Sequence, residues 1–494
     1  MFFRGSFLSG FCLLKRPLTA LLMASLLAAP SFADINLPEL GDVSQEGMTP
    51  RDEHQVGEAA VIEMRRSGSM MEDPEVTTYI NQLGNRLVEA NGTSLPFTFF
   101  VMNSPEVNAF ALPGGFVAVY SGLIGATQHE SELAAVMSHE ISHVTQHHIA
   151  RLIDAQRAMP WLTMAAMGLA LLASRSGSGD LAMGALAASS GYAIQRQLDF
   201  TYAFEQEADR IGMQTLIKSG FDPWAMPTFF DRLQRYNRLV ENNAPEFLRT
   251  HPVTYKRITD AQERLQDQPY KQVPDSADYL FVRERARVLQ SDNKATVDMY
   301  KATLAGKRYG NLPAHLYGLA LAQSKARDFD GAWLTLQKAH DAFGLARSHP
   351  ALEYLGGSIR MGQGRYDEAI KLFREGERHF PGSRVLVYGE IDALIAARNY
   401  PDALKAAQSA QELYLSDAWL YQRQARIYEA QGQSQQRHRM QAEYYARLNE
   451  YGAAVEQLEL AQRDPSNDFY LASSIDARLK ELQSMRGEDK DKKR

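Results

Sequence analysis

The pattern with the clearest chemical meaning is His139-Glu140-Ile141-Ser142-His143. It lies in 131–153, where apolar residues recur at helical spacing, so the segment is predicted to be a helix. Histidines four residues apart then project from one face and can reach a single metal ion. Glu140 lies about 100° around the helix, close enough to act on a water molecule at that ion. Zinc suits imidazole ligands and lowers the pKa of bound water to about 7.

Two further histidines follow the motif, but neither completes a zinc site on this helix. His147 comes eight residues after His139, which is about 12 Å along a helix, so one ion cannot bind both. The extended HExxHxxGxxH pattern fails because Gln146 and Ile149 stand where its glycine and third histidine belong. We therefore expect His147 and His148 to be surface residues.

A carboxylate from elsewhere in the chain must then supply the third ligand. Glu205 and Asp209 lie four residues apart on a predicted helix and share one face. Glu205 could bind the ion, and Asp209 could accept the N–H of a metal-bound imidazole and fix its tautomer. An exposed acidic helix start would have the same composition, because acidic side chains are favoured there. Spacing alone leaves both interpretations open.

The elements that must position these residues are predicted to be helices around a small sheet. Helical spacing covers 56–89, and β-type runs occupy 96–102 and 116–120, the second after the turn Pro113-Gly114-Gly115. An extended peptide substrate could pair with the second strand, although its sequence fits a buried strand equally well. The substrate-binding residues expected there are Phe116, Val117, Ala118 and Val119.

The composition is that of a folded protein of two to four domains. The chain has 494 residues, of which 45% are hydrophobic and 23% charged. Its net charge of −6 argues against a non-specific nucleic-acid binder, which would be basic. The chain has one cysteine, Cys12, which excludes a zinc ribbon or an iron–sulfur cluster.

The start of the chain predicts export. Residues 1–33 contain a basic start, about a dozen apolar residues and a small-residue end, which are the features of a signal peptide cleaved after Ala33. The apolar run is shorter than the roughly 20 residues that span a bilayer. A polar leader is expected over 34–55.

Two apolar arms, 160–173 and 181–194, flank a tip rich in serine and glycine and predict a helical hairpin. Each arm is too short to cross a membrane. Three interpretations of 160–194 stay open: core helices, a mobile lid beside the site, and a peripheral membrane contact.

A repeat of about 34 residues dominates the remainder of the chain. A small residue follows three positions after an aromatic residue in each clear unit, as in Phe329/Ala332, Tyr366/Ala369 and Tyr400/Ala403. This pattern resembles the tetratricopeptide repeat. We predict an α-solenoid of helix pairs over 276–480 with a concave binding surface, followed by a charged, disordered tail at 487–494. A plain helical bundle is the alternative.

Several motifs upstream of the repeats together resemble the M48 family of zinc metallopeptidases. HExxH is followed by Glu205-x-Glu-Ala-Asp209, and two further motifs are Asn108-Ala109-Phe110 with its Pro-Gly-Gly turn and His251-Pro252 leading to Arg257-Ile258. The resemblance implies a mostly α protein with a zincin-like α+β metallopeptidase domain, predicted over 56–270. It implies one Zn²⁺ per chain, bound by His139, His143 and Glu205, with Asp209 behind the ligands.

The resemblance also points to His251, for which three roles stay open. Its imidazole could donate to the oxyanion of the tetrahedral intermediate. It could instead occupy the fourth position on the ion and inhibit the enzyme, or stand next to a helix start without a catalytic role. The reaction expected from this resemblance is endopeptidase cleavage, with Glu140 as the general base and His251 as a second catalytic residue.

A signal peptide, an M48 domain and C-terminal repeats together resemble the periplasmic M48 proteases that assist outer-membrane assembly. This resemblance implies unfolded or misassembled outer-membrane β-barrel proteins as substrates and a chaperone-like role. It also implies contact with the barrel-assembly machinery through the repeat surface. The rival hypothesis is a non-proteolytic chaperone or adaptor with a latched or structural zinc ion.

Overall fold

The computed structural model describes residues 49–153, 201–239, 245–268, 272–344, 347–464 and 468–491. The predicted signal peptide 1–33, residues 34–48 of the predicted leader and the predicted hairpin 160–194 lie outside the described residues. No helix within the described ranges is long and apolar enough to span a bilayer.

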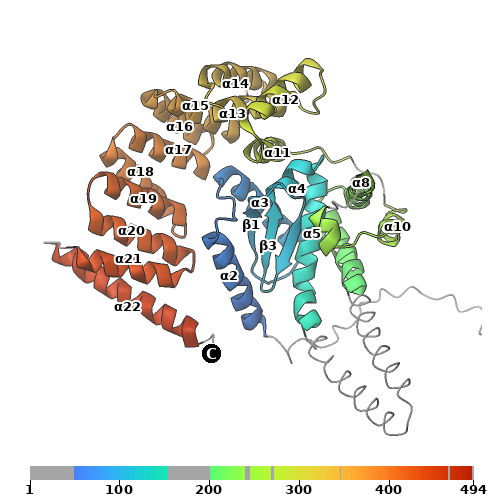
Figure 1. Ribbon diagram of the computed structural model, residues 1–494, viewed down its shortest axis with the longest axis horizontal. Helices are drawn as coiled ribbons and strands as arrows, with labels where there is room; N and C mark the ends of the chain where they lie inside the picture. The colour runs from blue at the N-terminus through green and yellow to red at the C-terminus, as the bar shows by residue number, and fades with distance from the viewer. Residues whose placement is uncertain are drawn as a thin grey trace, which may run out of the picture. The chain divides into compact units, whose positions relative to one another are not determined.

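A three-stranded mixed sheet lies at the centre of the N-terminal half (Figure 1). Its strands are β1 (Thr98–Met102), β2 (Ala109–Leu112) and β3 (Phe116–Tyr120), in the order β1-β3-β2. β3 runs parallel to β1 and antiparallel to β2. At the turn into β3, Gly115 has a φ of 94°, and an added Cβ would lie 1.9 Å from the Pro96 carbonyl oxygen, so glycine is required there.

The expectation that a substrate pairs with Phe116, Val117, Ala118 and Val119 is wrong. These residues form β3, the central strand, whose backbone already pairs with β1 on one side and β2 on the other. Their side chains are also buried. A peptide can add only to the edge of a sheet, where N–H and C=O groups are unpaired.

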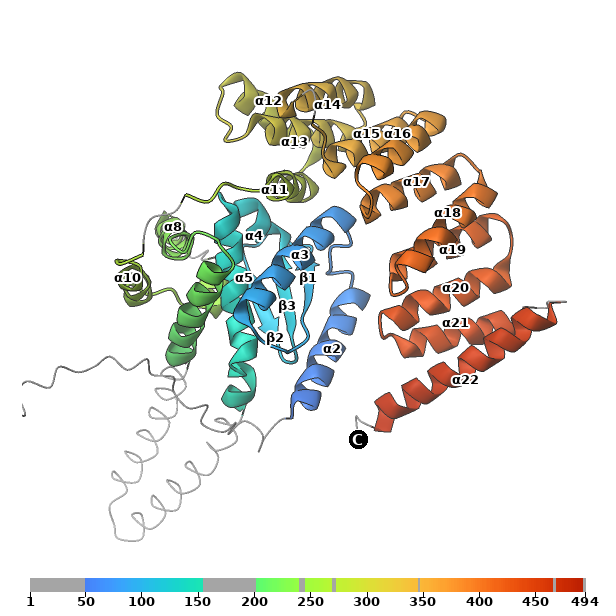
Figure 2. The same ribbon diagram turned by 180° about the vertical axis from the view of Figure 1, so that it is seen from behind.

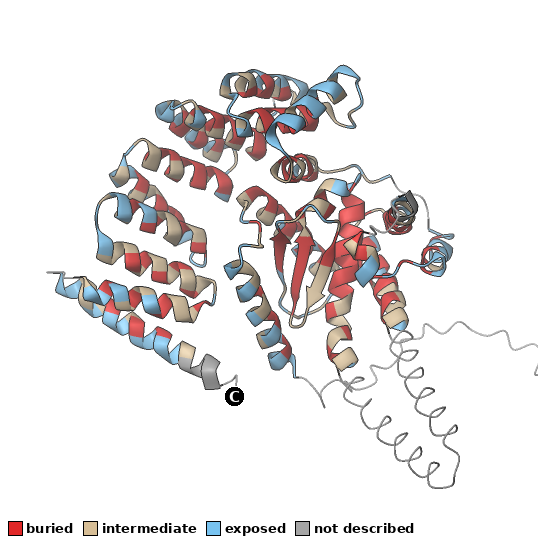
Figure 3. Ribbon diagram, in the orientation of Figure 1, coloured by how far each residue is buried: buried red, intermediate tan, exposed pale blue. Residues whose placement is uncertain are grey.

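Helices cover both faces of the sheet (Figures 1 and 2). On one face α2 (Pro50–Arg66) packs Val61 into a small apolar cluster with the sheet. On the other face α3 (Pro74–Asn91) and α5 (Glu130–Thr145) share the main core with the alternate strand residues. Buried residues accordingly dominate β1, β3 and α5 (Figure 3).

The leader was expected to reach residue 55, but α2 already begins at Pro50. Thr49 and Asp52 form a capping box at its start, and proline suits the first helical position. Residues 50–55 are therefore helical, because local capping stabilises the start of α2.

The N-terminal half continues with further helices, and the chain then passes into paired helices. The first group comprises α4 (Ser121–Ala126), a helix whose described part is 201–218, α8 (Ala225–Leu239), α9 (Glu246–Thr250) and α10 (Tyr255–Arg264). The paired helices are α11 (Ala277–Leu289), α12 (Asn293–Ala305), α13 (Leu312–Lys325), α14 (Phe329–Phe343), α15 (Pro350–Gly362), α16 (Tyr366–His379), α17 (Arg384–Ala396), α18 (Tyr400–Leu413), α19 (Ala418–Ala430), α20 (Ser434–Arg447), α21 (Tyr451–Arg463) and α22 (Phe469–Asp491).

The small residues of the tetratricopeptide-like pattern are buried, as expected where two helices pack closely. Ala332, Ala369 and Ala403 are all fully buried at the starts of α14, α16 and α18. The expected disordered tail is wrong over 487–491, because α22 continues to Asp491. The chain is thus mostly helical, with one small sheet and a C-terminal series of helix pairs.

Candidate metal centre

The helix α5 carries His139, Glu140 and His143 into the interior. His139 and Glu140 are fully buried, and His143 is slightly exposed. The two imidazole Nε2 atoms lie 3.0 Å apart, as expected for side chains one helical turn apart. The helix was predicted to run to residue 153, but it ends at Thr145, and His147 has a φ of 51°.

The helix at 201–218 brings a carboxylate to the two histidines. Gly212 lets it approach α5 closely, because an added Cβ would lie only 3.1 Å from the His139 amide nitrogen. One oxygen of Glu205 lies 3.4 Å from His139 Nε2, and the other lies 3.4 Å from His143 Nε2. Glu205 is itself buried, which excludes the exposed acidic helix start considered from its sequence.

A third imidazole reaches the same point from the end of α9. His251 Nδ1 lies 3.0 Å from Glu205 Oε1 and 3.4 Å from His139 Nε2. Its ring stacks on Phe247, with centroids 5.0 Å apart, and its Nε2 lies 3.6 Å from Glu140 Oε1. Among the described residues, these four side chains form a group whose ligand atoms all lie within 4.8 Å of one another.

The spacing of these atoms fits a tetrahedral ion. With zinc–nitrogen and zinc–oxygen bonds of about 2 Å, neighbouring ligand atoms of a tetrahedron are separated by about 3.3 Å. Five of the distances among atoms of His139, His143, Glu205 and His251 are 3.0–3.4 Å, and their ligand atoms all lie within 4.8 Å of one another. Both carboxylate oxygens of Glu140 are buried without a hydrogen-bond partner in the described structure, which leaves them available to a water molecule. The residues therefore fit zinc with a general base beside it.

Behind the ligands, Asp209 and Arg257 hold His139 and Glu205 in place. Asp209 Oδ1 lies 3.0 Å from His139 Nδ1, on the side of the ring away from the metal-binding atoms. Arg257 donates to both oxygens of Asp209, at 2.7 and 2.8 Å. Another of its nitrogens lies 2.8 Å from Glu205 Oε2. Arg257 was noted in the sequence only as part of a motif, and its place beside Glu205 was not predicted.

The charges of this cluster follow from these contacts. Burial alone would lower the pKa of His139, but the hydrogen bonds to Asp209 and Glu205 raise it to about 10. Burial opposes the charge on Asp209 too, yet the Arg257 guanidinium keeps the pKa of that carboxyl below its usual value. Metal binding must therefore displace a proton from His139, because only a neutral imidazole can bind the ion.

His148 is a site residue that the sequence interpretation missed. It was expected on the surface, but it is only 3% exposed. Its Nδ1 lies 2.9 Å from His143 Nδ1, and its Nε2 lies 3.2 Å from Glu207 Oε2. Phe204 stacks on the ring with centroids 4.5 Å apart. Burial and the adjacent His143 lower the pKa of His148 to about 3, so its ring is neutral at pH 7.

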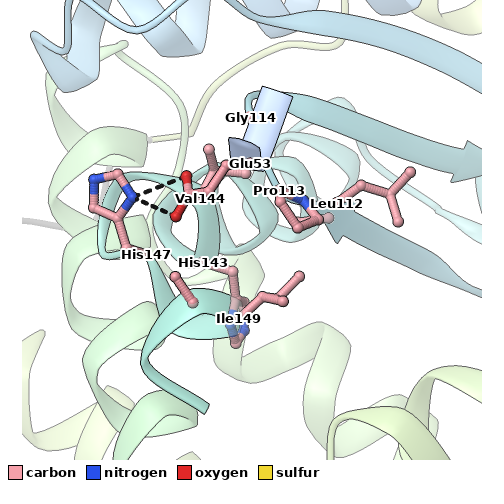
Figure 4. Close-up of a pocket in the computed structure, with 10 residues that line it drawn as sticks. Glu53, Leu112, Pro113, Gly114, His143, Val144, His147 and Ile149 are labelled. Atoms are coloured by element: carbon pink, nitrogen blue, oxygen red, sulfur yellow. Dashed lines mark hydrogen bonds and ion pairs between the residues drawn. The ribbon is translucent and has the colours of Figure 1, made fainter. Parts of the chain in front are cut away.

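A small pocket opens beside His143 at the end of β2 (Figure 4). His147 points away from the ligands and contacts both carboxylate oxygens of Glu53 at 3.1 Å. This contact ties the start of α2 to the end of α5. The pocket lies between α5 and β2. Its lining includes Ala111, Leu112, Pro113, Gly114, His143, Val144 and Ile149.

The comparisons with known proteins agree with this geometry. Residues 74–265 match Peptidase family M48. The β-barrel assembly-enhancing protease of Escherichia coli (strain K12) is 38% identical over 369 residues, which are 72% of this chain and 74% of that protein. Its namesake from Yersinia pestis is 39% identical over 305 residues, 61% of this chain and 62% of that protein.

A more distant relative shares a shorter part of the chain. The mitochondrial metalloendopeptidase OMA1 of Schizosaccharomyces pombe is 31% identical over 196 residues, 40% of this chain and 55% of that protein. A buried His/His/Glu cluster, a glutamate beside it and these similarities lead to one conclusion. The chain belongs to peptidase family M48 and is a metalloendopeptidase.

Proposed function

We propose that this metalloendopeptidase uses one zinc ion in the periplasm to cleave unfolded or misassembled outer-membrane β-barrel proteins. The observation that carries the proposal is the convergence of His139, His143 and Glu205 at tetrahedral spacing beside Glu140, whose carboxylate makes no hydrogen bond in the described structure. The name of the E. coli relative supports the choice of substrate. The signal-like residues 1–33 support export, with cleavage after Ala33.

The described residues supply positions for each proton movement in peptide hydrolysis. A zinc ion held by His139, His143 and Glu205 would polarise the scissile carbonyl and make the attacking water more acidic. Glu140 accepts the proton of that water and then delivers it to the nitrogen of the leaving amine. Asp209 keeps His139 oriented, and Arg257 keeps Asp209 ionised.

The outer edge of β2 is the candidate position for the substrate backbone. Tyr120 donates its N–H to the Asn108 carbonyl, so Asn108 and every second residue after it bond to β3. The alternation of an antiparallel pair then directs the N–H and C=O groups of Ala109 and Ala111 away from β3. An extended peptide bound there would run alongside the pocket at His143.

The variant Ala111→Pro tests this placement. Proline removes one outward N–H, and it is tolerated on edge strands, so we expect kcat/KM for a protein substrate to fall about tenfold with little loss of stability. The control Ala111→Ser keeps the N–H and should cleave at nearly the wild-type rate. Equal rates for the proline variant and wild type would exclude pairing at this position.

We further propose that His251 holds the enzyme in a resting state. Its Nδ1 has the spacing of a fourth ligand, and its Nε2 faces Glu140. The one ring therefore fills the fourth position on the ion and also contacts the general base. This arrangement favours a gate over an oxyanion donor, because a donor would leave the fourth position to the substrate.

Replacing His251 with alanine separates the two roles. If the imidazole blocks the fourth position, His251→Ala should speed casein cleavage on the order of tenfold while the chain keeps one zinc ion. Loss of activity with zinc retained would instead identify an oxyanion donor. A zinc-containing variant and wild type that both lack proteolysis would favour the non-proteolytic adaptor.

The substrate class is tested by comparing one barrel protein in two states. Residues 34–494 should cleave a urea-unfolded outer-membrane β-barrel protein and leave the same protein intact after it has refolded in detergent. Contact of the repeats with the barrel-assembly machinery is part of the proposal and predicts that removing 276–480 abolishes co-purification with it. Equal cleavage of folded and unfolded barrels would contradict the substrate class but not the hydrolytic mechanism.

A further inference from the structure

We propose that His148 is a positioning residue, which holds the imidazole of His143 in the orientation and tautomer that zinc binding requires. The inference rests on the proposed zinc site and extends it to a chain of three side chains, Glu207, His148 and His143. The chain leads from the protein surface to the metal position. Its links are the 3.2 Å contact from Glu207 to His148 and the 2.9 Å contact from His148 to His143.

The direction of each hydrogen bond follows from the atoms involved. His143 turns its Nε2 toward His139 and Glu205, so that atom must offer a lone pair to the ion, and the ring proton must lie on Nδ1. This Nδ1–H then donates to His148 Nδ1, which must be unprotonated. His148 therefore carries its proton on Nε2, where the only acceptor among its described contacts is the Glu207 carboxylate.

The two metal-binding histidines are thus supported in different ways. His139 is held from behind by the carboxylate of Asp209, whereas His143 is held by a neutral imidazole. A ligand histidine without a partner on its second nitrogen can rotate and change tautomer, which weakens metal binding. His148 supplies that partner for His143, and no other described side chain lies within hydrogen-bond distance of His143 Nδ1.

The local backbone is built to bring His148 to this place. In a continuous helix, a residue five positions after His143 would lie more than one turn further on, but the helix is interrupted at Gln146 and at His147, whose φ is 51°. A new helical stretch begins at 148. Phe204 then stacks on the His148 ring, and Arg151 fixes Glu207 at 3.0 Å.

The test compares a variant that removes the acceptor with one that keeps it. His148→Phe retains a ring that can stack on Phe204 but cannot accept a hydrogen bond. His148→Asn places an amide oxygen near the position of Nδ1 and restores the acceptor. Zinc affinity is measured by competition with a chromophoric chelator, and the melting temperature of the metal-free protein is measured beside it.

We expect His148→Phe to bind zinc about 10- to 100-fold more weakly than wild type, and His148→Asn to recover most of that loss. The metal-free melting temperatures should agree, and the cobalt-substituted phenylalanine variant should show a shifted visible absorption band. The matched control is His379→Phe, the same change at an exposed histidine of α16, which should leave zinc affinity unchanged. If His148→Phe fails to fold, Glu207→Leu provides the contrast, with an expected loss of about 3- to 10-fold.

Equal zinc affinity of wild type and folded His148→Phe would overturn the proposal. An asparagine variant as weak as the phenylalanine variant would also overturn it, because ring packing and not the acceptor would then be responsible. These outcomes differ from failure of the proposed function. A wild-type chain that binds no zinc overturns both, whereas zinc-dependent cleavage by wild type with unchanged variants overturns only the role of His148.

Discussion

Replacing Glu140 with glutamine is expected to lower the rate of peptide cleavage by about 10³-fold, while fold and zinc content stay near those of wild type. The amide has almost the shape of the carboxylate but cannot accept the proton of the attacking water, and general-base catalysis contributes about 10²–10⁴. Glu140 makes no hydrogen bond in the described structure, and its contact with His251 Nε2 is long, at 3.6 Å, so the exchange should cost little stability. Casein cleavage and bound zinc are measured on the same preparation.

The matched control is Glu89→Gln, the same change at an exposed position of α3. It should cleave casein at the wild-type rate. If folded, zinc-containing Glu140→Gln still cleaved casein, Glu140 would not be the general base.

Replacing Arg257 with leucine is expected to destabilise the metal-free protein by about 3–5 kcal/mol. Arg257 is almost fully buried and bonds both oxygens of Asp209, and it also contacts Glu205. Its removal leaves the buried carboxylates of Asp209 and Glu205 without their cationic partner. An uncompensated buried charge is strongly destabilising. The free energy of unfolding is measured by urea denaturation after zinc has been removed.

Arg264→Leu is the control for this prediction, because Arg264 lies on the same helix, α10, and is exposed. It should change the free energy of unfolding by about 0.5 kcal/mol or less. Arg257→Lys should fall between the two, since lysine keeps the charge but lacks the planar fork that bonds both oxygens. If Arg257→Leu were as stable as wild type, the stability of the metal-free protein would not depend on the ion pairs of Arg257 with Asp209 and Glu205.

The residues that could be predicted from the sequence are those whose positions depend on one helix. His139, Glu140 and His143 need only helical spacing, and that spacing directs both ligands to one point. Glu205 is different, because its helix comes from sixty residues away and its spacing also fits an exposed helix start. Family resemblance favoured the ligand role, and the close approach at Gly212 explains it physically.

The position of each strand within the sheet could not be predicted from short sequence patterns. A run such as 116–120 does not distinguish a central strand from an edge strand, because pairing depends on residues far along the chain. β2, at Ala109–Leu112, was not predicted, since four residues before a Pro-Gly-Gly turn carry little periodicity. The substrate edge was consequently placed on the neighbouring strand.

His148 was missed for a conformational reason. A non-glycine residue at positive φ is uncommon, so a sequence that is helical through 145 gives no sign that the helix is interrupted at His147. The burial of Arg257 could not be predicted from the sequence either, because an arginine in a polar helix is normally exposed. The repeats, by contrast, were predictable from their period, since each unit packs on its neighbours through residues close in sequence.

The measurement that tests the central claim most directly is zinc content paired with proteolysis for residues 34–494. We expect one zinc ion per chain, loss of casein cleavage when a chelator removes it, and recovery when one equivalent of zinc is returned. Glu205→Ala should lose both zinc and activity. Cleavage that persists in the zinc-free chain, or full zinc binding by Glu205→Ala, would show that this site is not a catalytic zinc site.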